Sequence, residues 1–598
     1  MSSSESLPLA SEDPWGAFLR SILDGLASAL TSCGATTPEE TILAQLDLEG
    51  GPEGEAAFPC HRAAQSVKRP APELAQAVAA AFPTGRLVRE ASAKGAYVNF
   101  RFDLEVLTQA TVDLVLSRGN RYGHREPVGP PVVVEHTSAN PTGPFHIGRV
   151  RNGIIGDTFA RVLRAAGSPV VTQYYVDDMG RQTAMITWVW SKPRESWPEP
   201  IRKAVDGQEV TGEKPDRHWG RPYPAVSVYL KEHEDAREEV AHLVQQLESG
   251  EPPPQHRMWA QAILDGMLQS LARLRISFDE LVWESDFVRD GSVNQVLERL
   301  RHTPHAVEES NGAWAIDAEG RGLPKESTHL VFQRSNGTSL YLTRDIAYHL
   351  AKFSRFARVI DVLGQDHQLH ARSLDVMLEE IGEARRPTYI IYQDITVPEG
   401  GRMSTRGGSA VWLDHLLAEA VDRARAEVLA RREDLADADV DRIAEAVATG
   451  AVRYHIVRAA PDKPVVFRWE DALSFEGRSG PFVQYSYARA SSVLRKGDAA
   501  QPPYPYEAAR LSHPEEAALI RILSRFPRTV AYAARTGHVH AVAGYAHELA
   551  DQFNRFYHAV PVLRSGDQRA SRVALVAATR QTLGNALELL GIVPLDAM

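Results

Sequence analysis

Cysteine is nearly absent from this 598-residue sequence, which contains only Cys33 and Cys60. Two isolated cysteines exclude a disulfide framework and a cysteine-rich structural zinc site. No apolar run reaches about 18 residues, and no basic segment followed by an apolar one opens the chain, so we expect neither a membrane span nor a signal peptide. The pattern GxxxxGK[ST] is also missing, which excludes a P-loop. We therefore expect a cytoplasmic protein.

Lysine is scarce as well, because it accounts for only ten of the 66 basic residues. The net charge of −11 is unfavourable for a nucleic-acid binder, but binding follows local rather than total charge. Residues 451–496 carry eight basic and four acidic side chains, a local excess of +4. This excess allows contact with a polyanion, although a solvated basic face explains it equally well.

The most informative stretch runs from Pro131 to Asn152 and reads PVVVEHTSANPTGPFHIGRVRN. Its apolar start predicts a strand that is covered on both faces and ends at Glu135. Turn residues follow at 140–144, and His146 opens a predicted helix. The first turn of a helix presents unpaired N–H groups and partial positive charge, which hold phosphate oxygens. The stretch therefore predicts an anion site, with His146 and Arg149 facing the same ligand.

Within this stretch, HIGR resembles the HIGH signature of class I aminoacyl-tRNA synthetases, and EHTSANPTGPFHIGRVRN is similar to arginyl-tRNA synthetases of the archaeal type. A second stretch, GGRMSTRGGSAVWLDHLL from Gly400 to Leu417, resembles the mobile KMSKS loop of this class. The sequence departs from the two patterns at four positions. Arg149 replaces the last histidine of HIGH, Arg402 and Arg406 replace the loop lysines, and Gly407 replaces a usual lysine. Arginine keeps the charge of lysine but not its compact geometry.

The resemblance implies roles for individual residues. It implies that the catalytic residues, which contact the triphosphate, are His146, Arg149, Arg402 and Arg406. ATP is implied to meet Gly143, His146, Gly148, Gly364, Asp366, His367, Met403 and Ser404. The arginine substrate is implied to meet Glu135, Asn140, Tyr341 and Asp345, the last two at its guanidinium. Mg²⁺ enters with ATP, and no metal site of the protein itself is expected.

Several of these positions have a second interpretation from the residues alone. Asp345 follows Tyr341 by four residues on a predicted helix, so the two share a face, and Asp345 is either a substrate ligand or a helix-surface residue. A carboxylate suits arginine because it accepts two parallel bonds from a guanidinium. The strand-end pair Asp177 and Asp178 either orients substrate or caps the next helix. His367 and His370 could suggest a metal, but no carboxylate or cysteine accompanies them at clear spacing.

Two further segments resemble parts of the family that contact tRNA. GAYVNF, residues 95–100, is similar to the end of a domain that touches the tRNA elbow, which implies Tyr97 and Asn99 as contacts; exposure for solubility is the alternative. GPFVQYSYARASSVLRK, Gly480–Lys496, resembles the anticodon-binding helical domain. Its aromatic and hydrogen-bonding side chains suit unstacked bases, although a tyrosine stripe at helical spacing also fits a core. The implied contacts are Gln484, Tyr485, Tyr487 and Arg489.

The element pattern and the resemblance predict an α/β Rossmann-type catalytic domain with a parallel sheet, an N-terminal α+β domain and a C-terminal all-α helical bundle. We place the N-terminal domain at 1–123, the catalytic domain at 124–417 with an insertion at about 190–255, and the bundle at 418–598. Predicted helices cover 15–30, 72–82, 226–248 and 256–275. Predicted strands cover 97–102, 131–135, 169–176 and 359–363, and a hairpin covers 313–316 and 328–334.

The implied function is an arginine–tRNA ligase that forms arginyl-adenylate from ATP and L-arginine and passes the arginyl group to the terminal ribose of tRNA(Arg). The implied partners are tRNA(Arg), L-arginine and ATP, and the chain is expected to work as a monomer without a membrane. One alternative is a catalytically weakened paralogue that only binds tRNA. Another is a supplier of arginyl-tRNA to a specialised pathway.

Overall fold

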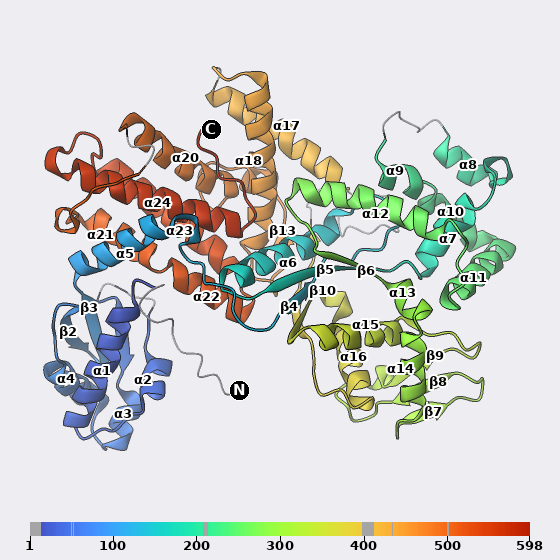
Figure 1. The fold of residues 1–598 in the computed structure, drawn as a ribbon, viewed down its shortest axis with the longest axis horizontal. Helices are drawn as coiled ribbons and strands as arrows, with labels where there is room; N and C mark the ends of the chain where they lie inside the picture. Colours follow the sequence, from blue (N-terminus) through green and yellow to red (C-terminus); the bar gives the residue numbers. More distant parts are fainter. Residues whose placement is uncertain are drawn as a thin grey trace.

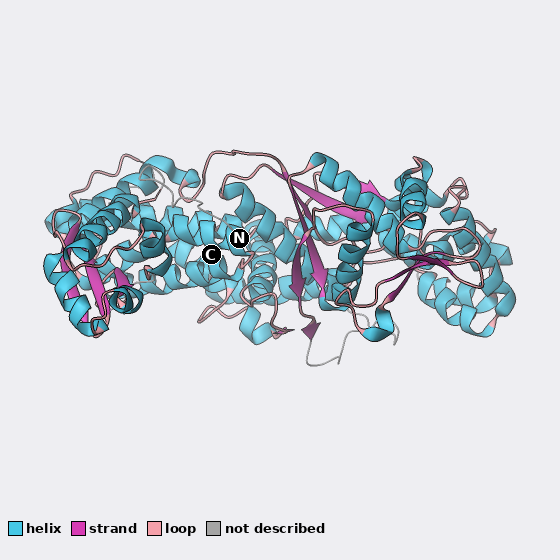
Figure 2. Cartoon of the chain, turned by 90° about the horizontal axis from the view of Figure 1, so that it is seen from below, coloured by secondary structure: helices cyan, strands magenta, loops and turns pink. Residues whose placement is uncertain are grey.

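The computed structural model describes residues 13–48, 51, 53–206, 213–396, 412–432, 434–498 and 502–598. Its strands gather in three regions along the long axis of the molecule, with helices between and around them (Figure 2). In the described ranges, no helix is long and apolar enough to cross a membrane.

A five-stranded parallel sheet forms the centre, in the order β11-β10-β4-β5-β6. Its strands are β4 (Val132–Glu135), β5 (Val170–Val176), β6 (Glu280–Trp283), β10 (Arg358–Gly364) and β11 (Thr388–Tyr392). The chain begins in the middle, adds β5 and β6 on one side, and then crosses over to add β10 and β11 on the other. This is the doubly wound order, and it confirms the predicted Rossmann-type domain.

Helices cover both faces of this sheet, as the apolar run before Glu135 predicts (Figure 1). Val132 and Val134 belong to one core with α6, whereas Val133 between them belongs to a second core with α15 and α16. Alternate residues of a strand point to opposite faces, so both faces are buried. The helices here are α6 (Ile147–Ala165), α7 (Arg181–Trp190), α12 (His256–Arg273), α13 (Glu284–Arg289), α14 (Ser292–Arg301), α15 (Tyr341–Arg355) and α16 (Gln368–Glu380).

The predicted insertion contains α8 (Glu199–Val205), α9 (Pro215–Gly220), α10 (Tyr223–Glu232) and α11 (Glu234–Glu248). The single helix predicted over 226–248 is wrong, because the chain breaks at His233, whose backbone is extended. The predicted hairpin is confirmed and gains a third strand. The antiparallel strands are β7 (Ala306–Glu308), β8 (Trp314–Asp317) and β9 (His329–Gln333).

The N-terminal part is an α+β unit with a three-stranded antiparallel sheet, in the order β1-β3-β2. Its elements are α1 (Gly16–Ser32), α2 (Glu39–Gln45), β1 (Ala56–Pro59), α3 (His61–Ser66), α4 (Ala71–Ala81), β2 (Val88–Lys94), β3 (Tyr97–Phe102) and α5 (Leu104–Arg118). The predicted exposure of Asn99 is wrong. β3 is the middle strand, and the successive residues Val98, Asn99 and Phe100 are all buried, so both of its faces are covered there.

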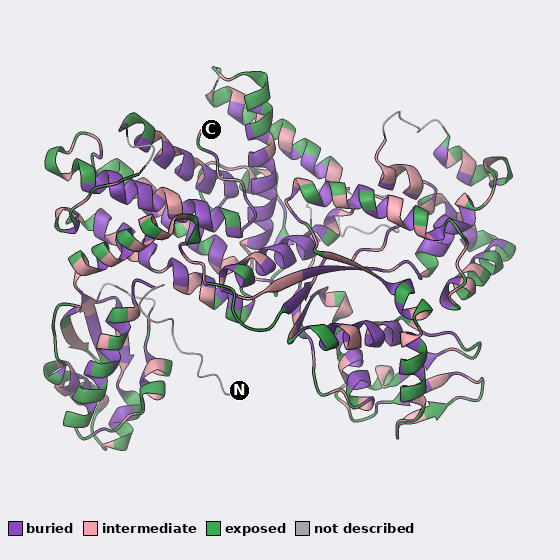
Figure 3. Ribbon diagram, viewed as in Figure 1, coloured by how far each residue is buried: buried purple, intermediate pink, exposed green. Residues whose placement is uncertain are grey.

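The remaining chain is helical, as predicted, apart from the short pair β12 (Ile395–Thr396) and β13 (Val465–Val466). Its helices are α17 (Leu413–Arg431), α18 (Asp437–Val457), α19 (Trp469–Ala472), α20 (Gly480–Lys496), α21 (Pro514–Ser524), α22 (Phe526–Thr536), α23 (His540–Ala559) and α24 (Arg569–Leu589). The predicted boundary at 417 falls inside α17. α18 and α24 each pack against α6, and burial is continuous across both contacts (Figure 3).

Candidate active site

The carboxyl ends of β4 and β10 lie next to each other at the point where the strand order reverses. Glu135 ends β4 and is paired with Asp361 of β10, while Gly364 ends β10. Doubly wound sheets bind ligands in the crevice outside such a switch point. Two predicted site residues, Glu135 and Gly364, therefore lie at the expected edge.

The signature helix α6 begins at this edge, and His146 is its N-cap. The Nδ1 atom of His146 accepts a hydrogen bond from the N–H of Gly148 at 3.0 Å, so the neutral ring carries its proton on Nε2. That Nε2 atom is buried without a hydrogen-bond partner among the described residues. Burial, followed by the charge of Arg149, lowers the pKa of His146. The first turn of α6 thus offers an unused donor in addition to its backbone N–H groups.

Arg149 stands exposed beside this donor and forms no ion pair with any residue that the structure describes. Its charge nevertheless reaches His367 on the other side of the switch point. Burial lowers the pKa of His367, and the charges of Asp366, Arg149, His370 and Asp345 act on the same ring. His367 therefore lies within electrostatic reach of both Arg149 and Asp345.

The backbone of the turn after β4 is strained at Thr137 and Ser138, whose φ angles are +73° and +37°. Residues other than glycine rarely adopt a positive φ angle, and a β-branched residue with one is a clear outlier. Asn152 of α6 holds the turn, because its Oδ1 accepts the N–H of Thr137 at 2.7 Å and its Nδ2 donates to the carbonyl of Val362 at 2.8 Å. Asn152 thereby ties the turn to β10 across the switch point.

The predicted adenosine turn follows β10 directly. A Cβ atom added to Gly364 would lie 2.4 Å from Oδ1 of Asp366 and 3.4 Å from the hydroxyl of Tyr392, so a larger residue would displace its neighbours. The side chains of Asp366 and His367 are 69% and 44% exposed. Both are therefore accessible to a ligand at the carboxyl edge.

Tyr341 and Asp345 lie on the first turns of α15, as predicted from their spacing. Tyr341 is 60% exposed, whereas the Asp345 side chain is 21% exposed and accepts a hydrogen bond from Nε2 of His370 at 2.5 Å. Burial raises the pKa of Asp345, but the bond from His370 and the charges of His370, His349 and Arg344 outweigh it, so the pKa lies below its usual value. A recessed, ionised carboxylate is the result.

Sequence reasoning gave His370 no role beyond a conceivable metal ligand. The structure pairs it with Asp345 instead, and the rings of His370 and Tyr341 lie 5.4 Å apart. No group of three or more potential metal ligands occurs in the described part of the chain. The only sequence signal for His370 was its place just after the turn that ends β10.

Asn140 connects the strained turn to the end of β5. Its Nδ2 donates to Oδ2 of Asp177 at 3.0 Å, while Oδ1 of Asp177 accepts the N–H of Gly180 at 3.0 Å at the start of α7. Asp177 thus fixes the turn that leads into α7, without capping the helix itself, and also orients Asn140, a predicted arginine-binding residue. Asp178 is buried and binds the N–H and hydroxyl of Ser285 at 3.0 and 2.7 Å, so it serves the fold.

The predicted loop residues Arg402, Met403, Ser404 and Arg406 lie outside the described residues. The segment after them returns to the first signature, because the N–H of Leu413 donates to the carbonyl of Phe145 at 2.8 Å and Trp412 meets the ring of His146 edge-on. Asp414 accepts bonds from Lys214 of the insertion at 2.7 Å and from Ser270 at 2.8 Å. The described end of the second stretch, residues 412–417, therefore lies beside the first signature.

The side chains predicted to contact tRNA differ in solvent exposure. Tyr97 is 44% exposed, but Asn99 is buried, and Gln484 is fully buried with its Nε2 donating to the carbonyls of Ala446 at 3.1 Å and Val593 at 2.9 Å. Tyr487 is buried beside Arg580. For Gln484 and Tyr487 the structure favours the alternative of a place in the core, and Asn99 is buried rather than exposed.

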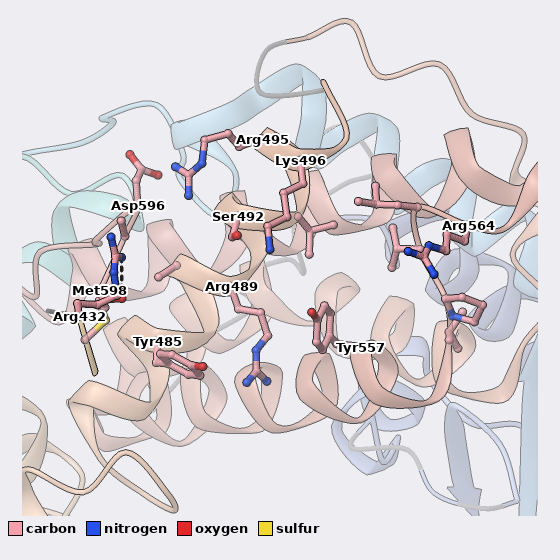
Figure 4. A pocket seen from close by; sticks show the side chains of 17 residues that line it. Arg432, Tyr485, Arg489, Ser492, Arg495, Lys496, Tyr557, Arg564, Asp596 and Met598 are labelled. Carbon is pink, nitrogen blue, oxygen red and sulfur yellow. Dashed lines mark hydrogen bonds between the residues drawn. The ribbon is translucent and has the colours of Figure 1, made fainter. Parts of the chain in front are cut away.

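Tyr485 and Arg489 line a cavity of about 550 Å³ in the helical region (Figure 4). The guanidinium of Arg489 lies between the rings of Tyr485 and Tyr557, at 4.8 and 5.1 Å. Further basic residues line the same cavity, namely Arg432, Arg495, Lys496 and Arg564. Aromatic planes among cations suit single-stranded nucleic acid. Of the eight basic residues in 451–496, Arg489, Arg495 and Lys496 line this cavity, and the acidic Asp596 lines it as well.

Comparison with known proteins agrees with this geometry. The family "tRNA synthetases class I (R), catalytic domain" matches residues 111–469, and "DALR anticodon binding domain" matches residues 483–598. An arginine–tRNA ligase of Methanocella arvoryzae is 40% identical over 540 residues, which cover 90% of this chain and 92% of that protein. One of Methanothermobacter thermautotrophicus is 41% identical over 573 residues, which cover 95% and 97%.

Among solved structures, the arginyl-tRNA synthetase of Thermus thermophilus matches with a TM-score of 0.79 at 28% identity, over 97% of this chain and 100% of that one. The match thus spans the N-terminal unit, the sheet and the helical region together. These likenesses and the site at the switch point lead to one conclusion: the chain belongs to the class I arginyl-tRNA synthetases.

Proposed function

We propose that this chain is an arginine–tRNA ligase that activates L-arginine with ATP and transfers the arginyl group to the 3′-terminal ribose of tRNA(Arg). One observation carries the proposal. At a single switch point, a helix start with an unused donor lies near a recessed, ionised carboxylate, Asp345. The helix start suits phosphate and the carboxylate suits a guanidinium.

In the first step, a carboxylate oxygen of arginine attacks the α-phosphorus of ATP, and the bond to the bridging oxygen of pyrophosphate breaks. The Nε2–H of His146 and the guanidinium of Arg149 stabilise the charge that develops on the phosphates. We assign Arg402 and Arg406 to the leaving pyrophosphate. Mg²⁺ arrives with ATP as part of the substrate.

In the second step, the ribose hydroxyl of tRNA attacks the arginyl carbonyl carbon and loses its proton, and AMP leaves with the electron pair of the broken bond. Both steps rely on positioning and charge stabilisation, so no covalent intermediate with the enzyme is needed. The nucleotide base and ribose lie against Gly143, Gly148, Gly364, Asp366 and His367.

Arginine lies between two carboxylates. Tyr341 and Asp345 meet the guanidinium, and Glu135 with Asn140 meets the α-amino and carboxylate ends. The support is that Asp345 is ionised and recessed, while Glu135 and Asn140 flank the strained turn at the sheet edge. Lysine offers only a point charge to Asp345 and forfeits the paired hydrogen bonds.

The tRNA contacts lie in the cavity of Tyr485 and Arg489 and at Tyr97 on the N-terminal sheet. The support is the combination of aromatic planes with cations in the cavity, and at Tyr97 the exposure of the ring. Asn99, Gln484 and Tyr487 are left out because their side chains are buried. We further propose that the enzyme works as a monomer, which sedimentation of the purified chain tests.

Arginine-dependent exchange between ATP and pyrophosphate tests the function, with and without tRNA and with lysine and citrulline as controls. Exchange that requires arginine is the expected result, and it would establish that a loop with arginine at both lysine positions is competent. Retained tRNA binding without exchange would favour the weakened paralogue instead. Exchange with lysine equal to that with arginine would contradict the assignment of Asp345.

A further inference from the structure

Behind the carboxyl edge lies a buried group of charged side chains that the steps above do not use. Lys352 of α15 is 1% exposed and donates hydrogen bonds to Glu135 and to Oδ1 of Asp361, the latter at 2.8 Å. Its ammonium also lies 3.9 Å from the ring centre of Tyr348. Because Glu135 and Asp361 are paired on neighbouring strands, one lysine bridges both strands of the switch point.

His349, one turn earlier on α15, extends this group towards the other end of the substrate. Its Nε2 lies 2.9 Å from Oδ2 of Asp361, and its Nδ1 lies 2.7 Å from the carbonyl oxygen of Asp345. A continuous chain of hydrogen bonds thus links Glu135, through Lys352, Asp361 and His349, to the backbone of Asp345. The scaffold thus contacts the carboxylate of Glu135 directly, whereas it reaches Asp345 only at the backbone carbonyl.

Glu135 is the most exposed member of this scaffold, at 12% of its side chain. One of its oxygens accepts from Lys352, and the other accepts from the hydroxyl of Ser138 at 3.0 Å. A carboxylate offers about four acceptor positions, so acceptor capacity remains on Glu135 for a ligand. Burial raises the pKa of Glu135, and the charge of Lys352 opposes that rise. Without Lys352, the carboxylate would be free to rotate and would take up a proton more readily.

We propose that Lys352 is a positioning residue for the α-amino group of the arginine substrate, on which it acts only through Glu135. This inference rests on the contact between Glu135 and the α-amino group proposed above. Lys352 holds Glu135 in one rotamer and keeps it anionic, so that an α-ammonium finds a preformed acceptor. A purely structural lysine would merely neutralise two buried carboxylates, and its loss would weaken all ligands alike.

Two analogues of arginine separate these roles. Agmatine keeps the amino group and lacks the carboxylate, whereas 5-guanidinopentanoate keeps the carboxylate and lacks the amino group. Calorimetric titration of the full chain measures both affinities in Lys352→Met and in the double variant Lys352→Met with Asp361→Asn, which preserves the buried charge balance. We expect agmatine to bind about 10-fold more weakly or worse, as for a lost charged hydrogen bond, and 5-guanidinopentanoate to bind as before.

Arg355→Met is the matched control, because Arg355 is an exposed cation at the end of α15 that pairs with Glu280. Both analogues should bind this variant as they bind the parent. Equal weakening of both analogues in the Lys352 variants, or unchanged agmatine affinity, would overturn the proposal. If Lys352→Met does not fold, the double variant supplies the measurement, and failure of both to fold would assign Lys352 to the fold alone.

Glu135→Gln tests the underlying contact separately. A loss confined to agmatine in Glu135→Gln, with none in the Lys352 variants, would refute the role of Lys352 and keep the contact. If Glu135→Gln changes the affinities for agmatine and for 5-guanidinopentanoate by the same factor relative to the parent, the contact is refuted, and the role of Lys352 with it.

Discussion

At the scale of single residues, the candidate site contains one recessed carboxylate whose neighbours keep it charged. Asp345 is recessed, and burial alone would raise its pKa, but His370 and neighbouring cations keep it ionised. An ionised carboxylate forms stronger hydrogen bonds with a cationic donor than a neutral group does. We therefore expect selectivity for arginine to depend on the charged state of Asp345.

Replacing Asp345 tests this dependence. Asp345→Asn removes one charge-assisted acceptor and should weaken arginine binding by about 1.5–3 kcal/mol, roughly 10- to 100-fold. The KM for arginine in the exchange reaction measures the effect. Asp235→Asn, an exposed position on α11, should leave this KM unchanged. An unaltered arginine KM in Asp345→Asn would remove the residue from the substrate site.

The same pair predicts a pH dependence. Burial lowers the pKa of His370, but its bond to Asp345 and the charge of Asp345 outweigh burial, so the pKa lies above the ordinary value of about 6.5. Below this pKa, an imidazolium competes with the substrate guanidinium for Asp345; above it, the competing charge is gone. The arginine KM should therefore fall as the pH rises from about 6 to about 8. In His370→Gln, which cannot ionise, the same measurement should be flat, and an equal slope in both proteins would exclude His370 as the cause.

At the scale of elements, α6 is the helix that shapes the site. Its N-cap is His146, its Asn152 holds the strained turn, and its Gly156 lies directly beneath His136 of that turn. A Cβ atom on Gly156 would lie 2.2 Å from the Cβ of His136, which is far too close. The absence of a side chain on Gly156 thus lets the helix approach the turn.

Gly156→Ala should therefore be destabilising. Forcing a methyl group into this contact should lower the free energy of unfolding by about 1–3 kcal/mol. Thermal unfolding followed by circular dichroism measures the loss. Gly544→Ala in α23 is the control, because a Cβ there meets nothing within 4 Å, and removing a helical glycine should stabilise by about 0.5–1 kcal/mol. Equal unfolding temperatures for the two variants would refute the close contact.

At the scale of the whole molecule, Arg453 joins the catalytic region to the helical region. Arg453 of α18 is fully buried and donates to Asp157 of α6 at 2.5 Å, to the carbonyl of Leu590 at 2.6 Å and to the carbonyl of Leu274. Burial lowers its pKa to about 10, so it remains a cation at neutral pH. One guanidinium thus fixes the signature helix relative to α18, α12 and α24.

Removing this cation should weaken the assembly of the regions. Arg453→Met leaves two buried carbonyls without this donor and removes one of the two cations that pair with Asp157, since Arg161 remains at 2.8 Å, and the loss should cost about 2–5 kcal/mol. Differential scanning calorimetry should show a clearly lower unfolding temperature. Arg442→Met on the same helix removes a cation that is 63% exposed and paired with Asp439 at 3.2 Å, so its effect should stay within about 1 kcal/mol. Matching thermograms for the two variants would contradict the central role of Arg453.

The sequence by itself determined the class of fold and named most residues of the candidate site. Strands and helices of the sheet follow from apolar periodicity and turn residues, which are local properties of the chain. The first signature keeps a strand end, a turn and a helix start within one stretch, so Glu135, His146 and Arg149 could be found without a structure. Exposure was less predictable, because whether Asn99 or Gln484 faces solvent depends on which distant elements cover it.

Only the tertiary structure decided which side chains meet. His370 pairs with Asp345 across 25 residues of chain, Asn152 with the carbonyl of Val362 across 210, and Lys352 with Glu135 across 217. A hydrogen bond requires its two atoms to approach within about 3 Å, and the folding of the sheet and its helices sets that separation. Sequence spacing carries no such information, because the intervening chain can return along many paths.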